Sequence, residues 1–203
     1  MGIMSLYHDI CLGNVFGSGH PIHPITVHYP LTTLMAAYGI DMTVHSRPYL
    51  PRLLTSLLPS TPVLAQVAYY SNAAGLIFMA PALITGFHEF YEIYKHLGTK
   101  RVEDGVVLQS YPQRTFNVAA IHGVLNALTG AYSLYLWRAR KNVPGHMSTP
   151  RQGLASGLVL GSLIFSAALG GKLVYDYGIG VQRQGSAIED KKAMWKDLSR
   201  HAE

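Results

Sequence analysis

The chain has 203 residues, of which 49% are hydrophobic and only 13% are charged, and its formal net charge is +5. Since an ordinary soluble domain carries about 25% charged residues, the composition argues against one, and no basic cluster points to nucleic acid. The single cysteine, Cys11, excludes an internal disulfide and a zinc or iron–sulfur site built from cysteines of one chain. Residues 1–46 contain no Lys or Arg, so a cleavable signal peptide is not expected.

Four long runs of the chain lack charge altogether. No Asp, Glu, Lys or Arg occurs in residues 10–40, 53–88, 115–137 or 152–171. About 20 mostly apolar residues are enough for a helix to cross a hydrocarbon core of about 30 Å. The sequence therefore predicts an all-α integral membrane protein, a four-helix bundle with spans at about 25–44, 63–87, 115–137 and 154–175.

The connections between the predicted spans differ in character. Segment 45–62 is punctuated by prolines, and segment 88–114, of mixed charge, is expected to prolong the second helix before it breaks near Gly98. Segment 138–153 is basic, with Arg138, Arg140, Lys141 and Arg151. Because Lys and Arg favour cytoplasmic loops, we expect the first and third connections on that side and both termini on the other.

The fourth predicted span carries Gly153, Gly157 and Gly161 at four-residue steps. Small residues at this spacing let helix backbones approach closely in lipid, and the pattern favours packing inside the bundle over a dimer seam. We expect residues 1–182 to form one transmembrane domain. The charged tail, 183–203, is able to form a short interfacial helix.

Five histidines are predicted to gather at one end of the bundle. In four antiparallel spans, the start of the first and third and the end of the second and fourth share a membrane face, which collects His20, His23, His28, His88 and His122. His28 is expected about one turn inside the first span. His122 lies deeper, with Asn126 one turn further along the same face. An ionisable group inside a span is a functional-site hypothesis by default; the alternative is that neutral imidazoles only link helices by hydrogen bonds.

Imidazole is a ligand for haem iron, copper, zinc and non-haem iron. We predict that His28 and His122 hold a b-type haem from facing helices, which fills both axial positions and favours electron transfer over oxygen chemistry. Lys172 is placed to meet the propionates, and Tyr175 closes the fourth span on the same side. The competing prediction is a copper, zinc or iron ion held by histidines of this group: His20, His23, His28, His88 and His122.

A second constellation is the stretch HEFYEIYKH, residues 88–96. If it is helical, His88, Glu92 and His96 lie one above the other and could bind a divalent ion. The favoured interpretation is a helix end emerging into water, with Glu92 facing Lys95 and His96. No phosphate loop, nucleophile elbow, paired-cysteine motif or HExxH is present, so the sequence does not decide whether the protein is an enzyme.

Two stretches of the sequence, taken together, are specific enough to indicate a family. GHPIHPITVHYP at 19–30 and GGKLVYDYGIGV at 170–181 resemble the opening and closing motifs of the domain of unknown function 2231 family, and IHGVLNALTGAY at 121–132 resembles its third span. The resemblance covers about 19–182. It implies a four-span membrane domain, and the joining of some bacterial relatives to Rieske-type iron–sulfur domains implies a redox membrane module. Residues 1–203 contain no such redox domain, and the polar HEFYE stretch departs from the family pattern.

The glycines of the closing motif suit the predicted site. Gly170 and Gly171 remove side chains where the fourth helix passes it, so that a flat ligand or a neighbouring helix can approach closely. Three functions remain open: a haem-b electron-transfer subunit acting between a quinone and a partner protein, a metal-handling membrane protein, and a cofactor-free scaffold or assembly subunit.

Overall fold

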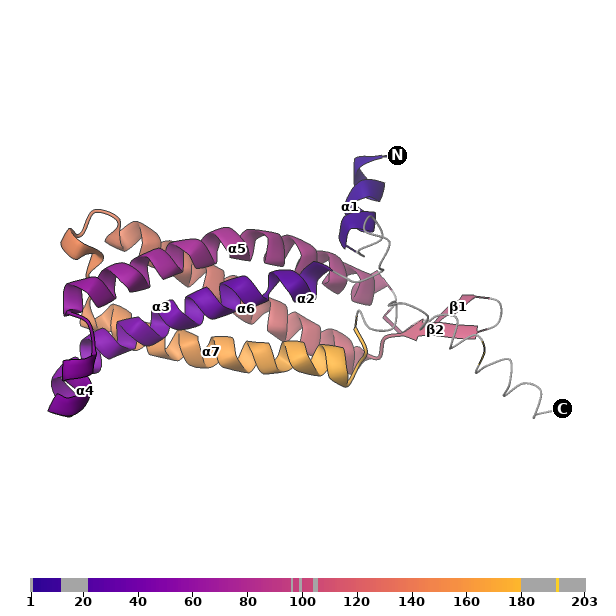
Figure 1. The fold of residues 1–203 in the computed structure, drawn as a ribbon. Coiled ribbons are helices and arrows are strands. Elements are labelled where there is room, and N and C mark those ends of the chain that lie inside the picture. Colours follow the sequence, from indigo (N-terminus) through magenta and orange to yellow (C-terminus); the bar gives the residue numbers. More distant parts are fainter. Residues whose placement is uncertain are drawn as a thin grey trace. The chain divides into compact units, whose positions relative to one another are not determined.

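The computed structural model describes residues 2–11, 22–95, 97–98, 100–103, 106–179 and 193, and its elements follow one another as drawn in Figure 1. The long helices are α3 (His28–Ser46), α5 (Thr61–Lys95), α6 (Gln113–Arg140) and α7 (Pro150–Tyr175). The shorter elements are α1 (Ile3–Cys11), α2 (Ile22–Thr26), η2 (Arg47–Tyr49), α4 (Arg52–Leu57), β1 (Lys100–Glu103), β2 (Val106–Ser110) and η3 (Pro144–His146). The predicted all-α class is confirmed, with one small antiparallel hairpin, β1–β2, which the sequence did not predict.

The four long helices correspond to the four predicted spans. Helix α5 continues to Lys95, and Gly98 then adopts a positive φ of 69°, which suits the break expected near this glycine. Helix α3 is preceded by the separate short helix α2, with Val27 between them. The sequence predicts His28 about one turn inside the span, whereas the structure places it at the first residue of α3, where it is exposed.

Helix α7 begins with a well-defined cap. Thr149 precedes Pro150, the first helical residue, where proline's fixed φ and missing N–H cost nothing. The Thr149 N–H donates to Gln152 Oε1 (2.8 Å), and the Gln152 N–H donates to Thr149 Oγ1 (3.3 Å). This reciprocal capping box ends the basic connection and fixes where the fourth helix starts.

Two of the described helices are long and apolar enough to cross a membrane, namely α5 and α7. Only 33% and 22% of their apolar windows are buried, so neither helix is the enclosed core helix of a globular domain. Helices α3 and α6 have 19 and 28 residues, about 28 and 42 Å at 1.5 Å per residue. Their length suffices, but they carry more polar side chains, and their crossing remains a prediction.

By clustering of contacts the chain divides into two compact units. Unit 1 comprises 1–25, 84–123 and 168–203, and unit 2 comprises 26–83 and 124–167. Helices α5, α6 and α7 therefore contribute residues to both units.

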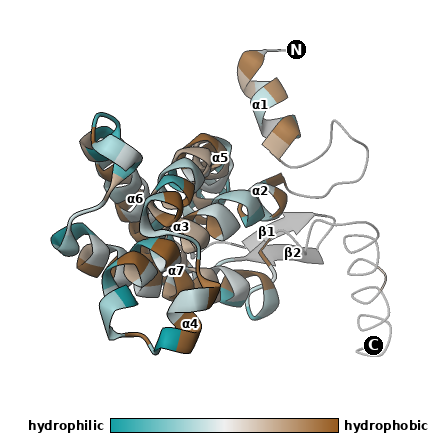
Figure 2. Cartoon of the chain, turned by 60° about the vertical axis from the view of Figure 1, so that its left-hand side comes forward, coloured by the Kyte–Doolittle hydropathy of each residue, from teal (hydrophilic) through white to brown (hydrophobic). Residues whose placement is uncertain are grey.

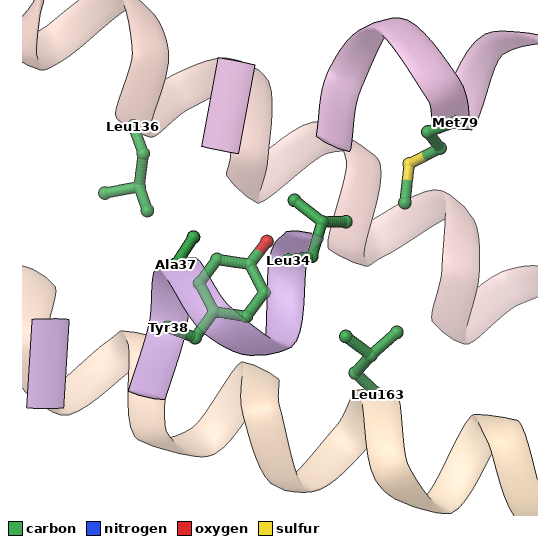
Figure 3. Close-up of a cluster of buried hydrophobic side chains, with 6 residues drawn as sticks. All are labelled: Leu34, Ala37, Tyr38, Met79, Leu136 and Leu163. Atoms are coloured by element: carbon green, nitrogen blue, oxygen red, sulfur yellow. The ribbon is translucent and has the colours of Figure 1, made fainter. Parts of the chain in front are cut away.

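Unit 2 is built around an apolar cluster to which all four long helices contribute. Leu34, Ala37 and Tyr38 of α3 are at most 1% exposed, and they pack with Met79 of α5, Leu136 of α6 and Leu163 of α7 (Figure 3). Around this cluster, polar side chains are buried as well: Asn72, Thr129, Ser133, Ser156 and Ser166. Two hydrogen bonds tie the middle of the unit together, from Tyr38 to Ser133 (Oη to Oγ, 2.5 Å) and from Asn72 Nδ2 to the Ser133 carbonyl (2.9 Å).

The outer surface of unit 2 exposes many apolar side chains, whereas its interior is partly polar. Leu154 and Leu158 of α7 are 73% and 72% exposed, and large apolar side chains are also exposed on the other helices: Val67, Ile77, Leu128 and Phe165. Figure 2 shows apolar residues along the helices and hydrophilic ones chiefly in the connections and at helix ends. Water would oppose this arrangement, whereas lipid favours it, because polar groups in a membrane protein are satisfied inside the protein.

Small residues allow the helices of unit 2 to approach closely. A Cβ at Gly153 would collide with the His45 ring, and one at Gly157 would lie 3.3 Å from Met42 Sδ, so this part of the glycine stripe faces α3 of the same chain. A Cβ at Gly161 would meet nothing within 4 Å. The stripe therefore packs within the unit at its first two positions, which is the favoured prediction.

We expect Gly75→Ala to destabilise unit 2 by about 1–3 kcal/mol, the usual cost of overpacking a filled core. The added Cβ would lie 2.6 Å from Leu34 Cγ, and Leu34 is fully buried, so it cannot move aside. Gly39→Ala is the matched control, since a Cβ there meets nothing within 4 Å; it should be neutral or stabilising by up to about 1 kcal/mol. Unfolding in mixed micelles measures both, and equal effects would contradict the packing described.

Unit 1 has its own apolar cluster: Ile93, Tyr111, Ala119, Leu173 and Ile179. Helix α1 also belongs to this unit, and its Tyr7 hydroxyl donates to the Ile84 carbonyl of α5 (2.9 Å). The hairpin follows α5, with Lys100 opposite Ser110 and Glu103 opposite Val106. The end of α5 in this unit is thus covered by a helix that the sequence analysis did not assign.

Candidate functional site

Three of the five grouped histidines lie in unit 1, each on a different helix: His23 on α2, His88 on α5 and His122 on α6. His20 lies outside the described residues. His28 belongs to unit 2, so its predicted pairing with His122 stays a prediction.

The His23 ring lies against α5. Its Nδ1 is 3.2 Å from Thr85 Oγ1, and a Cβ on the neighbouring Gly86 would lie 2.7 Å from its Cε1. Gly86 therefore provides the space that the imidazole occupies. The hydrogen bond at Nδ1 orients the ring, as second-sphere groups do for metal-binding histidines.

The His122 ring is half-buried and lies against Gly170 of α7. A Cβ at Gly170 would be 3.1 Å from His122 Cε1, tighter than an ordinary contact. Gly170 was predicted to let a flat ligand or a neighbouring helix approach the fourth helix closely. In the structure, the group that approaches it is the imidazole of His122 on α6. At Gly171, a Cβ would meet only Tyr175 of its own helix, at 4.0 Å. Asn126 belongs to unit 2, where its Nδ2 donates to Ser166 Oγ (3.0 Å).

Lys172, the predicted propionate partner, is paired with another side chain near the end of α7. Lys172 Nζ donates to Asp176 Oδ2 (2.6 Å) and lies 5.8 Å from the Tyr177 ring centroid. Tyr175 is 88% exposed. Both residues are therefore at the surface at the end of α7, as groups of a membrane interface commonly are.

His88 lies in a buried polar group at the contact of α1 with α5. Its ring meets the Tyr7 ring edge-on, with centroids 5.1 Å apart. His88 and Glu89 are 5% and 7% exposed, and Cys11 is 2% exposed. Burial, with a smaller contribution from Cys11, raises the pKa of Tyr7 to about 12, and burial likewise raises the pKa of the Cys11 thiol.

The HEFYE stretch lies in the last turns of α5, but it does not emerge into water as expected, because His88, Glu89 and Glu92 are 5%, 7% and 7% exposed. Glu92 accepts a hydrogen bond from Lys95 Nζ at 2.8 Å, which is the expected pairing. His96 lies outside the described residues. Within the part of the chain that the structure describes, no three His, Cys, Asp or Glu side chains come together as candidate metal ligands; a set containing His20 is not covered by this statement.

We expect Cys11 to react slowly with a maleimide, because the thiolate is the reactive form and this thiol is buried with a raised pKa. Tyr7→Ala removes the hydroxyl that anchors α1 to Ile84 and should accelerate labelling by at least about tenfold. Leu6→Ala is the control, since Leu6 is 43% exposed on the same helix. The single cysteine makes the measurement unambiguous; fast labelling of the unaltered protein would contradict the docking of α1.

A second polar centre, which the sequence analysis missed, lies in unit 2. Asp41 of α3 and Arg140 of α6 form an ion pair (Oδ2 to Nη1, 2.7 Å) in which both side chains are 1% exposed. Arg140 also donates from Nε to the His146 carbonyl (2.8 Å) and from Nη2 to the Ala65 carbonyl of α5 (3.1 Å). The guanidinium thus bonds to residues of α3, α5 and η3, and a buried pair with such additional bonds is the kind that proteins tolerate.

The segment that follows α6 wraps around this ion pair. His146 has a φ of 53°, unusual for a residue with a side chain, and its Nδ1 donates to the Arg140 carbonyl (2.9 Å). Its ring stacks on Tyr69 with centroids 3.9 Å apart. Ser148 Oγ donates to Asp41 Oδ1 at 3.2 Å.

The burial of Arg140 changes what is expected of the basic connection, segment 138–153. The sequence analysis counts Arg140 among the cations that set membrane orientation, but a buried, ion-paired guanidinium cannot interact with headgroups. Arg138, Lys141 and Arg151 remain exposed there. The orientation still rests on the bias of Lys and Arg and stays a prediction.

The signal for Asp41 was present in the sequence. It is the first charged residue after the run 10–40, and it falls inside the predicted span 25–44. A carboxylate within a span requires a partner. Arg140, which directly follows the third predicted span, is 99 positions away, and nothing in the sequence selects it over other cations.

A helical protein that exposes leucine and phenylalanine along its helices while burying an ion pair, serines and asparagine is a membrane protein. The chain belongs to the family described as predicted membrane protein (DUF2231), whose model matches residues 19–183. The predicted family is confirmed. No curated protein and no solved structure matches the chain.

Proposed function

We propose that the protein crosses the bilayer four times, through α3, α5, α6 and α7, and that it is a haem-b electron-transfer subunit. His122 and His28 would hold the haem iron, and the bound haem would supply electron transfer between a quinone and a partner protein. Helices α5 and α7 support the crossings by length and apolarity, and α3 and α6 support them by packing between these helices in unit 2.

The observation that supports the haem proposal is that three helices of unit 1 each carry one histidine. Two of them, His23 and His122, lie beside glycines of a neighbouring helix, Gly86 and Gly170. Bis-histidine ligation needs two such rings from different helices. Because His28 is exposed at the start of α3, His23 is the alternative second ligand: its Nδ1 is bonded to Thr85, which sets Nε2 as the nitrogen that would face an iron.

A cofactor-free scaffold or assembly subunit is the second candidate. The same contacts favour it, since the rings of His122 and His23 fill the space left by Gly170 and Gly86. In that case the imidazoles only hold helices together. A copper, zinc or iron site would need His20 or another residue outside the described part of the chain to complete its ligand set.

Purification in mild detergent, with spectra before and after dithionite and a metal analysis, separates these functions. A Soret band with sharp reduced α and β bands, obtained directly or after incubation with haemin, is expected. His122→Gln, which keeps a polar side chain of similar size, should abolish it. His28→Gln and His23→Gln identify the second ligand, because only one of them should lose the low-spin spectrum.

Two outcomes overturn the haem proposal. A folded protein that stays colourless after haemin incubation and contains no metal supports the scaffold function. A colourless protein with stoichiometric copper, zinc or iron supports the metal site.

A further inference from the structure

Unit 2 contains a chain of hydrogen bonds that leads from a half-exposed histidine to the buried carboxylate. His45 Nε2 is 2.9 Å from Ser148 Oγ, and Ser148 Oγ is 3.2 Å from Asp41 Oδ1. Beyond Asp41, Ser156 Oγ lies 3.5 Å from Oδ2 and 3.2 Å from the Tyr132 hydroxyl. The ion pair alone does not require His45 or these hydroxyl groups.

The direction of each bond follows from chemistry. Asp41 is paired with Arg140, so it is an acceptor, and Ser148 must donate its one hydroxyl proton to it. His45 Nε2 must then be the donor to Ser148. A serine held in this way cannot be activated by the histidine as a nucleophile, because the imidazole nitrogen that faces it already carries a proton. The order of the three groups suits proton transfer toward the carboxylate.

We propose that His45 and Ser148 form a pathway that carries a proton from water to the buried carboxylate of Asp41, which accepts it. A proton arrives at His45 Nδ1 from water. The Nε2 proton passes to Ser148 Oγ while the Ser148 proton passes to Asp41 Oδ1, which leaves His45 and Asp41 both neutral. No electron moves, and the net change is the transfer of one proton from water to Asp41.

The surroundings of Asp41 permit it to change charge. The charged and titratable groups that face it are Arg140 of α6, His45 of α3 through Ser148, and the phenols of Tyr38 and Tyr132. Helix α7 offers Ser156, and α5 contributes the Ala65 carbonyl to Arg140. When Asp41 is neutral the ion pair is lost, but Arg140 keeps the carbonyls of His146 and Ala65 as hydrogen-bond acceptors.

The backbone of α7 holds His45 in position. A Cβ at Gly153 would lie 2.9 Å from His45 Cγ and closer still to Cδ2, so only glycine leaves space for the ring in this orientation. A glycine on the first turn of α7 thus has a second use beyond helix packing. It places the imidazole within reach of Ser148.

The test is a rapid pH jump from about 8 to about 3, an interval that contains the ordinary pKa of an aspartic acid side chain. Infrared absorption of the protonated carboxyl is followed in the detergent-solubilised full chain. The band is assigned to Asp41 by its loss in Asp41→Asn. If that variant does not fold, Asp41→Glu serves instead, since it should shift the band.

His45→Gln and Ser148→Ala should each slow the appearance of the band by about 100-fold, the lower end of what a positioned proton donor contributes. Its final amplitude should be unchanged. Ser46→Ala is the matched control, because Ser46 lies beside His45 but bonds only the Thr43 carbonyl of its own helix, and it should have no effect. An Asp41 band that never appears, or one that appears equally fast in His45→Gln, overturns the proposal.

Discussion

Arg140→Met should destabilise the protein by about 3–5 kcal/mol, the cost of removing one partner of a buried ion pair. The variant leaves Asp41 as an uncompensated charge at a site that is 1% exposed. It also removes the donors to the Ala65 and His146 carbonyls, which join α5 and the α6–α7 connection to the same guanidinium. Unfolding in mixed micelles, followed by circular dichroism, measures the loss.

The double variant Asp41→Leu with Arg140→Met is the informative control. Replacing both charges by apolar side chains of similar volume is often neutral or stabilising by about 1–4 kcal/mol, so most of the stability lost in Arg140→Met should return. Arg138→Met, at an exposed position two residues away, should change stability by less than about 0.5 kcal/mol. A double variant as unstable as the single one would show that the pair is not an isolated charge-compensating unit.

Leu34→Ala should destabilise the protein by about 2–5 kcal/mol, as buried leucine truncations do when the cavity cannot collapse. Leu34 is 0% exposed and lies in the cluster to which α3, α5, α6 and α7 all contribute (Figure 3). Leu158→Ala is the matched control. Leu158 is 72% exposed on the apolar surface of α7, so its truncation should cost less than about 1 kcal/mol.

Combining Leu34→Ala with Gly75→Ala tests the packing directly. The Leu34 side-chain atoms that a Cβ at position 75 would strike are absent from the alanine variant. The double variant should therefore be more stable than the sum of the single effects predicts, with a coupling of about 0.5–3 kcal/mol, as expected for residues in contact. Strict additivity would contradict the contact between α3 and α5.

The positions of the long helices could be predicted because lipid imposes a strong rule on the sequence. Charge is excluded from the segments that cross, and the uncharged runs 53–88 and 152–171 accordingly coincide with α5 and α7. The continuation of α5 beyond the apolar run was expected up to a break near Gly98, and its last turns, which carry Glu89, Glu92 and Lys95, stay helical. Helix propensity and the Glu92–Lys95 pair continue the helix where hydropathy no longer indicates it.

The polar interior could be predicted only in part. A histidine inside a span is conspicuous, so His122 was identified, and its neighbour Gly170 followed from the closing motif. The Asp41–Arg140 pair was missed because each residue lies near a predicted span end, where charges are ordinary. Burial at 1% exposure depends on which helices pack together, and a single sequence contains no direct record of that.

The docking of α1 illustrates the same limit. Its residues Tyr7 and Cys11 are four positions apart and share one face of the helix. The partners of Tyr7, Ile84 and His88, lie in α5, and Ile84 is 77 positions away. The composition of such a short apolar helix does not distinguish it from a terminal tail.

Labelling of single cysteines from the two sides of a proteoliposome tests the central claim, four crossings of the bilayer, most directly. In a Cys11→Ser background, cysteines replace Ser56 of α4, Asn142 after α6 and Gln113 at the start of α6, all three outside the predicted spans. Four crossings predict that positions 56 and 142 react from one side of the membrane and position 113 from the other. Reaction of positions 56 and 142 from opposite sides, or of all three from the same side, would contradict the account.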